Sequence, residues 1–153
     1  MNDLRTIDLL ALREAGGLQF FYPGCPMARR SGIHQTHTDQ RVRNYKEKLG
    51  WAAKAAANAH GVIWYRAHIP MPGAIVLGVT IFRKAPITNK PDLDNYLKLV
   101  ADALQQARIY VNDAQIVEYF PGTAKQSSAT EGVRVIVVPK GRMEALGFGR
   151  TDE

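Results

Sequence analysis

The chain contains the stretch Lys90-Pro91-Asp92-Leu93-Asp94-Asn95-Tyr96-Leu97-Lys98, which follows shortly after an apolar, β-branched run. That run, Gly73–Phe82, predicts a strand in the centre of a sheet. Beyond the stretch, apolar residues recur at helical spacing, as Leu93, Leu97, Val100, Leu104 and Ala107. The stripe predicts an amphipathic helix over residues 93–107. A buried strand, a loop and a helix therefore form the centre of the expected fold.

The segment before this centre predicts a short helix and a strand. The helix is expected over residues 3–15, with Asp3 as its N-cap and Gly16-Gly17 at its end. The strand is expected over Leu18–Tyr22, because the aromatic run stops at a Pro-Gly pair. Residues 25–40 have the Pro, Gly, Ser and Thr content of a loop.

The segment after the centre predicts two further strands. They are expected at Ile116–Phe120 and Gly132–Val138, joined by a polar loop that contains Lys125. Pro139-Lys140-Gly141 stops the last strand, and residues 141–153 are expected to form a mobile tail.

These elements predict one small α+β domain over residues 1–153, in the order (α)βαβαββ. The expected sheet is mixed and has helices packed on it. Residues 1–16 are interpreted as an N-terminal extension of this domain.

The composition excludes several classes of protein. An apolar fraction of 46% and a charged fraction of 22% are typical of a soluble globular chain. No apolar run approaches the roughly 18 residues that a membrane span needs. A single cysteine, Cys25, excludes an intrachain disulfide and a zinc site with several cysteines. The net charge of +6 favours a polyanionic partner, so we expect a cytoplasmic protein that meets polyanions.

Positive charge is concentrated between residues 28 and 54, where there are seven Lys and Arg residues and two acidic ones. This segment holds a loop and an expected helix from Arg41 to about His60, with Thr38 or Asp39 as its N-cap. One interpretation is a solvated helix face. The other is a mobile arm that contacts backbone phosphates. The candidate DNA-contacting residues, here and in the loop before residue 91, are Arg29, Arg30, Arg41, Arg43, Lys46, Lys84 and Lys90.

Each acid around residues 92–113 has an ordinary structural interpretation. Asp92 precedes an amphipathic run and would make a good N-cap. Asp94 falls in the first helical turn, where the helix dipole favours negative charge, and Lys98 stands at ion-pair spacing from it. Asn112-Asp113 is a pair that turns the chain.

Their joint occurrence favours a catalytic hypothesis. Asp113 meets Asp92 and Asp94 only if the chain after the helix turns back beside it, and converging carboxylates repel unless a cation lies between them. Carboxylate oxygens suit Mg²⁺ or Mn²⁺, which binds a phosphate oxygen and lowers the pKa of a bound water. Lys98 would neutralise the phosphate or orient the water. Without an evident nucleophilic Ser, Cys or His pair, the pattern indicates direct attack by water.

Three motifs resemble the RusA family of Holliday junction resolvases. The family signature combines D-L-D-N-x-x-K, D-A-L in the same helix, and D-D-x-Q-[IV]. The matching segments are Asp92–Lys98, Asp102-Ala103-Leu104 and Asn112–Ile116. This resemblance implies a small α+β homodimer, bacterial or phage-encoded, that resolves four-way DNA junctions with Mg²⁺.

By position, the resemblance implies that Asp92, Asp94 and Asp113 are metal-site residues and that Lys98 is the catalytic lysine. There are two departures. Asn112 replaces the first acid of the last motif, and the basic residues ahead of Asp92 are thinned to Arg83, Lys84 and Lys90.

The leading hypothesis is therefore a homodimeric, Mg²⁺-dependent endonuclease that resolves four-way junctions in DNA recombination and repair. One alternative is a less selective nuclease for branched or flap DNA. The other is a DNA-binding protein without catalysis, in which the acids are caps and surface pairs.

Overall fold

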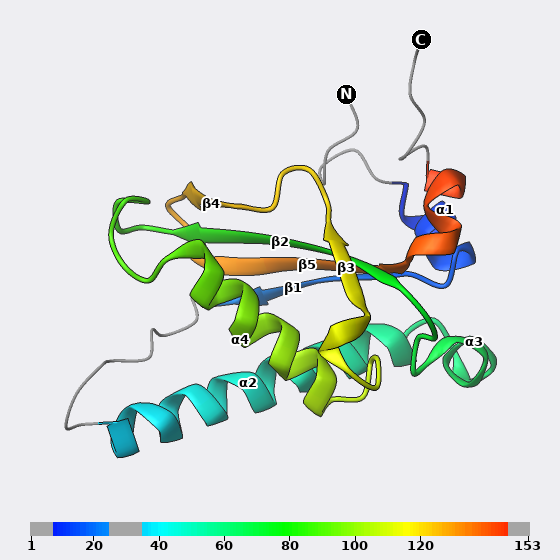
Figure 1. Ribbon diagram of the computed structural model, residues 1–153, viewed down its shortest axis with the longest axis horizontal. Coiled ribbons are helices and arrows are strands. Elements are labelled where there is room, and N and C mark those ends of the chain that lie inside the picture. Colours follow the sequence, from blue (N-terminus) through cyan, green and yellow to red (C-terminus); the bar gives the residue numbers. More distant parts are fainter. Residues whose placement is uncertain (1–7, 25–34, 147–153) are drawn as a thin grey trace, which may run out of the picture.

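The computed structural model describes residues 8–24 and 35–146, which form helices on a twisted sheet (Figure 1). The elements in chain order are α1 (Leu9–Glu14), β1 (Leu18–Pro23), α2 (Gln35–Asn58), α3 (Val62–His68), β2 (Ile75–Arg83), α4 (Leu93–Gln106), the 3₁₀ helix η1 (Asp113–Gln115), β3 (Ile116–Tyr119), β4 (Ala124–Ser127), β5 (Gly132–Pro139) and the 3₁₀ helix η2 (Lys140–Leu146).

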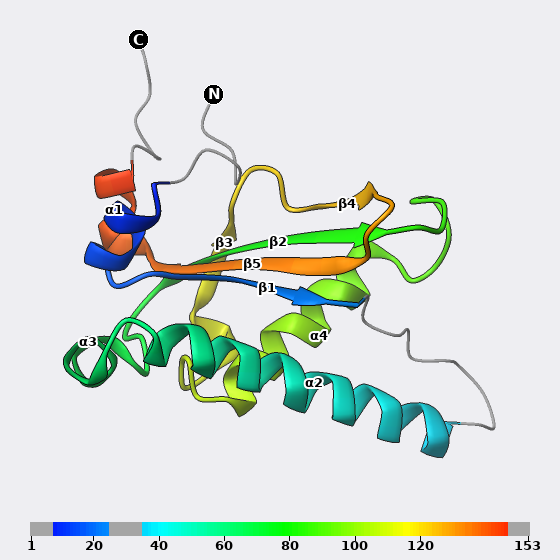
Figure 2. The same cartoon turned by 180° about the vertical axis from the view of Figure 1, so that it is seen from behind.

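The sheet is mixed, as the sequence predicts. Its strand order is β1-β5-β2-β3, and β4 pairs with β2 beyond the end of β3. β2 is antiparallel to β5 but parallel to both β3 and β4. The view from behind shows the same strands stacked above α2 (Figure 2). The α+β class is confirmed, and the strands on either side of α4 are neighbours because Ile75 of β2 pairs with Ile116 of β3.

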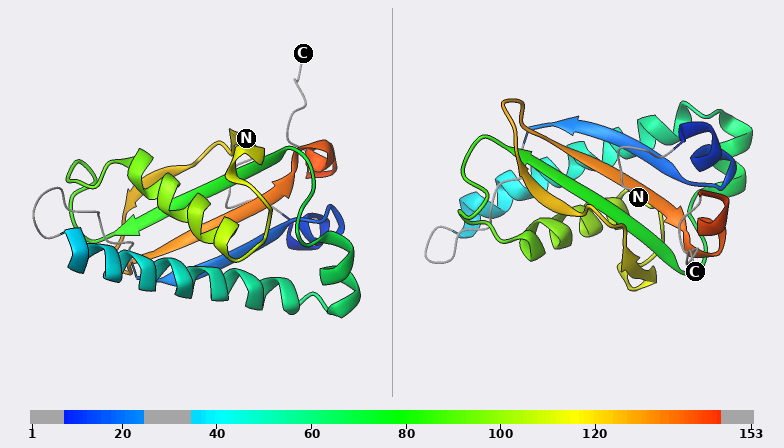
Figure 3. Two further views of the ribbon diagram at one scale, coloured as in Figure 1. Left: turned by 60° about the horizontal axis from the view of Figure 1, so that its bottom comes forward. Right: turned by 90° about the horizontal axis from the view of Figure 1, so that it is seen from above.

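Helices α2 and α4 cover one face of the sheet (Figure 3, left). Alternate residues of β2, from Ile75 to Ile81, are fully buried against them. The predicted apolar stripe of α4 faces this core: Leu97, Val100 and Leu104 are buried. The layers therefore leave the polar side of α4, with its acidic N-terminal turn, facing outward.

Among the described residues, the other face of the sheet is covered at one end only, by α1 and η2 (Figure 3, right). Leu12 of α1 and Met143 of η2 pack there against Val76 and Ile136. This second cluster explains why residues 140–146 form a 3₁₀ helix where the sequence predicted a tail from residue 141. Residues 147–153 lie outside the described part.

Two predicted helix starts are corrected. Helix α1 begins at Leu9, where the Asp8 carboxylate accepts hydrogen bonds from the Leu10 and Ala11 N–H groups. Asp3, the predicted cap, lies outside the described residues. Helix α2 begins at Gln35, so neither Thr38 nor Asp39 is its N-cap.

One α-helix and one strand have no counterpart in the prediction. Helix α3 has seven residues and starts after Gly61, which offers no side-chain cap. Strand β4 has the sequence AKQS, which lacks the apolar alternation of a strand and was predicted as a loop. Neither α2 nor any other helix of the described residues is both long and apolar enough to cross a membrane.

Candidate active site

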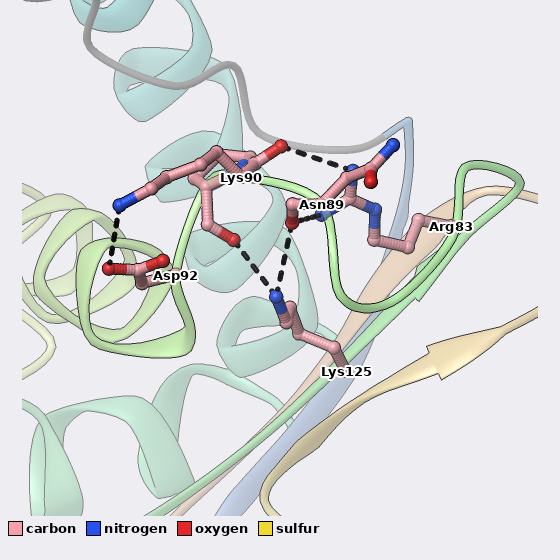
Figure 4. Close-up of polar contacts among 6 residues, drawn as sticks. Arg83, Asn89, Lys90, Asp92 and Lys125 are labelled. Carbon is pink, nitrogen blue, oxygen red and sulfur yellow. Dashed lines mark hydrogen bonds and ion pairs between the residues drawn. The ribbon is translucent and has the colours of Figure 1, made fainter.

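Asp92 stands at the N-terminus of α4 with its carboxylate available. The residue occupies the N-cap position with extended backbone angles, and its side chain makes no capping hydrogen bond. Only its main-chain carbonyl is engaged with the helix, accepting from the Asn95 and Tyr96 N–H groups at 3.1 and 3.3 Å. The carboxylate is 60% exposed and lies 3.4 Å from the Lys90 ammonium (Figure 4). The capping interpretation therefore does not account for this side chain.

Asp94 and Lys98 are both exposed on the outer side of α4. Among the described residues no ion pair joins them within 4.0 Å, so the predicted surface pair is not formed. Helical spacing places Asp94, Lys98 and Gln105 on one stripe, because eleven residues complete about three turns. This stripe extends from the first turn of α4 to the last.

Asp113 opens η1, immediately before β3. Its N–H group donates to the Gln105 Oε1 atom at 2.8 Å, which holds it beside the last turn of α4. At about 1.5 Å per residue, Gln105 lies about 16 Å along the helix axis from Asp94. The chain does turn back beside α4, but it reaches Asp113 at the end opposite to Asp92.

The three carboxylates are consequently not gathered around one point. Within residues 8–24 and 35–146, no three His, Cys, Asp or Glu side chains lie close enough to hold a metal ion. Carboxylates repel one another unless a cation lies between them. All three of these side chains are exposed, so they have room to change position.

Tyr119, at the end of β3, interacts electrostatically with acids from both ends of α4. Partial burial, then the nearby carboxylates of Asp94 and Asp113, raise the pKa of its phenol. Both carboxylates disfavour the ionised form of this one phenol, although they lie toward opposite ends of α4. The sequence reasoning missed Tyr119, although the predicted strand Ile116–Phe120 contains it.

The family comparison bears directly on this surface. The family model for the endodeoxyribonuclease RusA matches residues 23–138, more than half of the chain. The chain belongs to the RusA family. It is therefore an endodeoxyribonuclease of the Holliday junction resolvase type. A search of curated proteins found no match.

In this RusA-family chain, Asn112 has a structural task. Its Oδ1 atom accepts from the Ala114 N–H group at 2.8 Å and forms a capping box with Gln115. The amide that replaces the first acid of the family motif thus starts η1 and orients the chain that presents Asp113.

Gln115, the glutamine of the same motif, anchors η1 to the segment just before β2. Its Nε2 atom donates to the carbonyls of Met71 and Gly73, both at 2.9 Å. Its Oε1 atom accepts from the N–H groups of Val111 and Asn112, both at 3.0 Å. Gln115 is therefore a positioning residue. The sequence motif included it, but no role was predicted for it.

Gln115→Ala is expected to lower the free energy of unfolding by about 2–3 kcal/mol, because four hydrogen bonds of about 0.5–1.5 kcal/mol are lost and partly replaced by water. Urea denaturation of both proteins measures the difference. Gln106→Ala is the matched control, since the exposed Gln106 makes one side-chain bond, to Asp102, and its loss is expected to cost less than about 0.5 kcal/mol. Equal effects of the two substitutions would contradict the anchoring role.

The candidate DNA-contacting residues separate into groups. Arg41 and Arg43 are exposed on α2, and Lys84 and Lys90 are exposed in the loop before α4. Lys46 is different, because its ammonium lies 2.6 Å from the Asp102 carboxylate and is only 16% exposed. Lys46 therefore links α2 to α4. Two further candidates, Arg29 and Arg30, lie outside the described residues.

Proposed function

We propose that this RusA-family protein is a Mg²⁺-dependent, structure-specific endonuclease that resolves four-way DNA junctions by paired nicks. The observation that carries the proposal is the Asp92 carboxylate, which stands at a helix N-cap without capping it. Asp94 and Lys98 are likewise exposed without the predicted ion pair between them. Capping does not account for Asp92, and an ion pair with Asp94 does not account for Lys98, whereas phosphodiester hydrolysis uses all three side chains.

The donor set fits the metal that the family implies. Asp92, Asp94 and Asp113 offer only hard carboxylate oxygens, which suit Mg²⁺ or Mn²⁺. Asp92 and Asp94, at one end of α4, would hold the ion, with Asp113 as the proposed third ligand, and the ion would supply Lewis-acid activation of the phosphate and of a water. Asp113 lies at the far end of the α4 stripe, so its contribution is tested separately from that of the other two acids.

Lys98 and Tyr119 provide the remaining chemistry of the proposed site. Lys98, one turn after Asp94 on the exposed stripe, would neutralise the scissile phosphate or orient the attacking water. The phenol of Tyr119 is protonated at neutral pH even at its ordinary pKa, which its surroundings raise further, and it can donate a hydrogen bond to a phosphate oxygen.

Paired nicks in two opposed strands require two active sites, which a C2 homodimer supplies. The DNA contacts are proposed for Arg41 and Arg43 of α2, for Lys84 and Lys90, and for Arg29 and Arg30, which lie outside the described residues. We leave Lys46 out of this surface because its charge is neutralised by Asp102.

A cleavage panel tests the proposal. The purified protein is incubated in Mg²⁺ with a four-way junction, a fork, a flap and a linear duplex of shared sequence. Preferential cutting of the junction at paired positions is expected. Equal cutting of fork and flap would favour the less selective branched-DNA nuclease. Binding that EDTA leaves unchanged, with no nicking in Mg²⁺ or Mn²⁺, would favour a DNA-binding protein without catalysis.

A further inference from the structure

The chain segment directly ahead of Asp92 is held by two cations that lie apart in the sequence. Residues 89–91 belong to neither a helix nor a strand, yet they determine where the Asp92 carboxylate stands. Lys125 approaches this segment from β4, and Arg83 approaches it from the end of β2 (Figure 4).

Lys125 donates from its Nζ atom to two main-chain carbonyls, those of Asn89 at 3.3 Å and Pro91 at 3.1 Å. Its position follows from the sheet, since β4 runs parallel to β2 with Lys125 paired to Ile81. The ammonium therefore extends from the sheet edge to the loop that precedes α4. Bonds from a charged donor are stronger than neutral ones and hold the carbonyls in a defined orientation.

Arg83 holds the same segment from the end of β2. Its Nη1 atom donates to the Asn89 carbonyl at 3.1 Å, and its Nη2 atom donates to the Lys90 carbonyl at 3.3 Å. The guanidinium lies 5.9 Å from the centre of the Tyr96 ring, and the residue is 6% exposed. Arg83 is the one charged residue classed as buried in the described part of the chain.

If the only task of Arg83 and Lys125 were to stabilise the fold, this arrangement of the two cations would be unfavourable. Among the described residues neither Arg83 nor Lys125 has a carboxylate within ion-pair distance. A buried charge such as that of Arg83 is unfavourable without a counterion unless hydrogen bonds compensate it. The side-chain hydrogen bonds of Arg83 and Lys125 go to three consecutive carbonyls, those of residues 89–91. The hydrogen bonds of both side chains thus act on the backbone of residues 89–91, and Arg83 also contacts the Tyr96 ring.

We infer that Lys125, together with Arg83, is a positioning residue that fixes residues 89–91 and thereby sets the place of Asp92 and the first turn of α4. The inference rests on the proposed function in one respect: it gives this positioning a catalytic purpose. A carboxylate that does not cap its own helix depends on the preceding backbone for its position, and a displacement of about 1 Å at such a site can cost about 100-fold in rate.

The test compares Lys125→Met with Lys125→Arg and with Lys140→Met. Methionine keeps the length and apolar stem of lysine without its donors, and arginine restores the donors. Lys140 is the control because it is a half-exposed lysine that pairs with Glu118 on the surface. Two quantities are measured: amide hydrogen exchange along α4 in the protein without metal, and kcat and KM for junction cleavage.

Lys125→Met is expected to speed exchange of the Asn95 and Tyr96 amides by about 10-fold, because both donate to the Asp92 carbonyl, while the rest of α4 keeps its protection. In cleavage, kcat is expected to fall by about 10–100-fold with KM changed by less than about 3-fold. Lys125→Arg is expected to recover most of both effects, and Lys140→Met to show neither.

Unchanged exchange at the first turn in Lys125→Met, or exchange accelerated equally throughout the chain, would overturn the inference. A rise in KM with kcat unchanged would overturn it as well, since Lys125 would then serve DNA binding. If the wild-type protein cuts no junction, the proposed function fails, but the exchange measurement still decides whether Lys125 positions residues 89–91.

Discussion

Asp94→Asn is expected to lower the rate of junction cleavage by at least about 100-fold, because one carboxylate of the proposed metal site is lost in an isosteric change. Junction binding is expected to persist within about 3-fold, since the substitution removes a negative charge from a protein that binds a polyanion. Gel-shift binding in EDTA and single-turnover cleavage in Mg²⁺ measure the two quantities.

Glu118→Gln is the control for this change. Glu118 is an exposed acid on β3 that pairs with Lys140, so the same loss of one charge is expected to leave cleavage within about 2-fold. Cleavage by Asp94→Asn at the wild-type rate would remove Asp94 from the mechanism.

Asp92→Asn and Asp113→Asn extend the experiment to the other two acids. Both are expected to lose cleavage to a similar degree. Asp113→Asn is the more informative, because its main chain is bonded to Gln105 at the opposite end of α4 from Asp92. Full activity of Asp113→Asn alone would restrict the site to the N-terminal end of α4.

Lys98→Ala is expected to lower kcat by about 100-fold while the affinity for the junction changes by less than about 3-fold, because the ammonium stabilises charge that develops on the phosphate. Lys140→Ala removes another exposed lysine, which pairs with Glu118 away from α4, and is expected to leave both values unchanged. Weaker junction binding at unchanged kcat would assign Lys98 to electrostatic positioning of DNA.

The central part of the fold follows from the sequence because its signals are strong and local. The apolar stripe from Leu93 to Ala107 predicted α4 within one residue at its end, and the β-branched run from residue 73 predicted β2. The short elements do not follow in the same way. Strand β4 has no apolar pattern of its own and forms because β2 offers a partner edge.

The site could be predicted as a set of residues but not as an arrangement. The spacing of Asp92 and Asp94 was sufficient to place both at one helix end. The position of Asp113 depends on a hydrogen bond to Gln105. The burial of Arg83 depends on its contact with the Tyr96 ring, one turn into α4. Such contacts are tertiary, and residue spacing does not encode them.

The most direct test of the central proposal uses an end-labelled four-way junction and the purified wild-type protein, with Mg²⁺ or with EDTA. Paired cuts in opposed strands that require Mg²⁺ are the predicted result. An uncut junction under both conditions, although the protein binds it, would contradict the account.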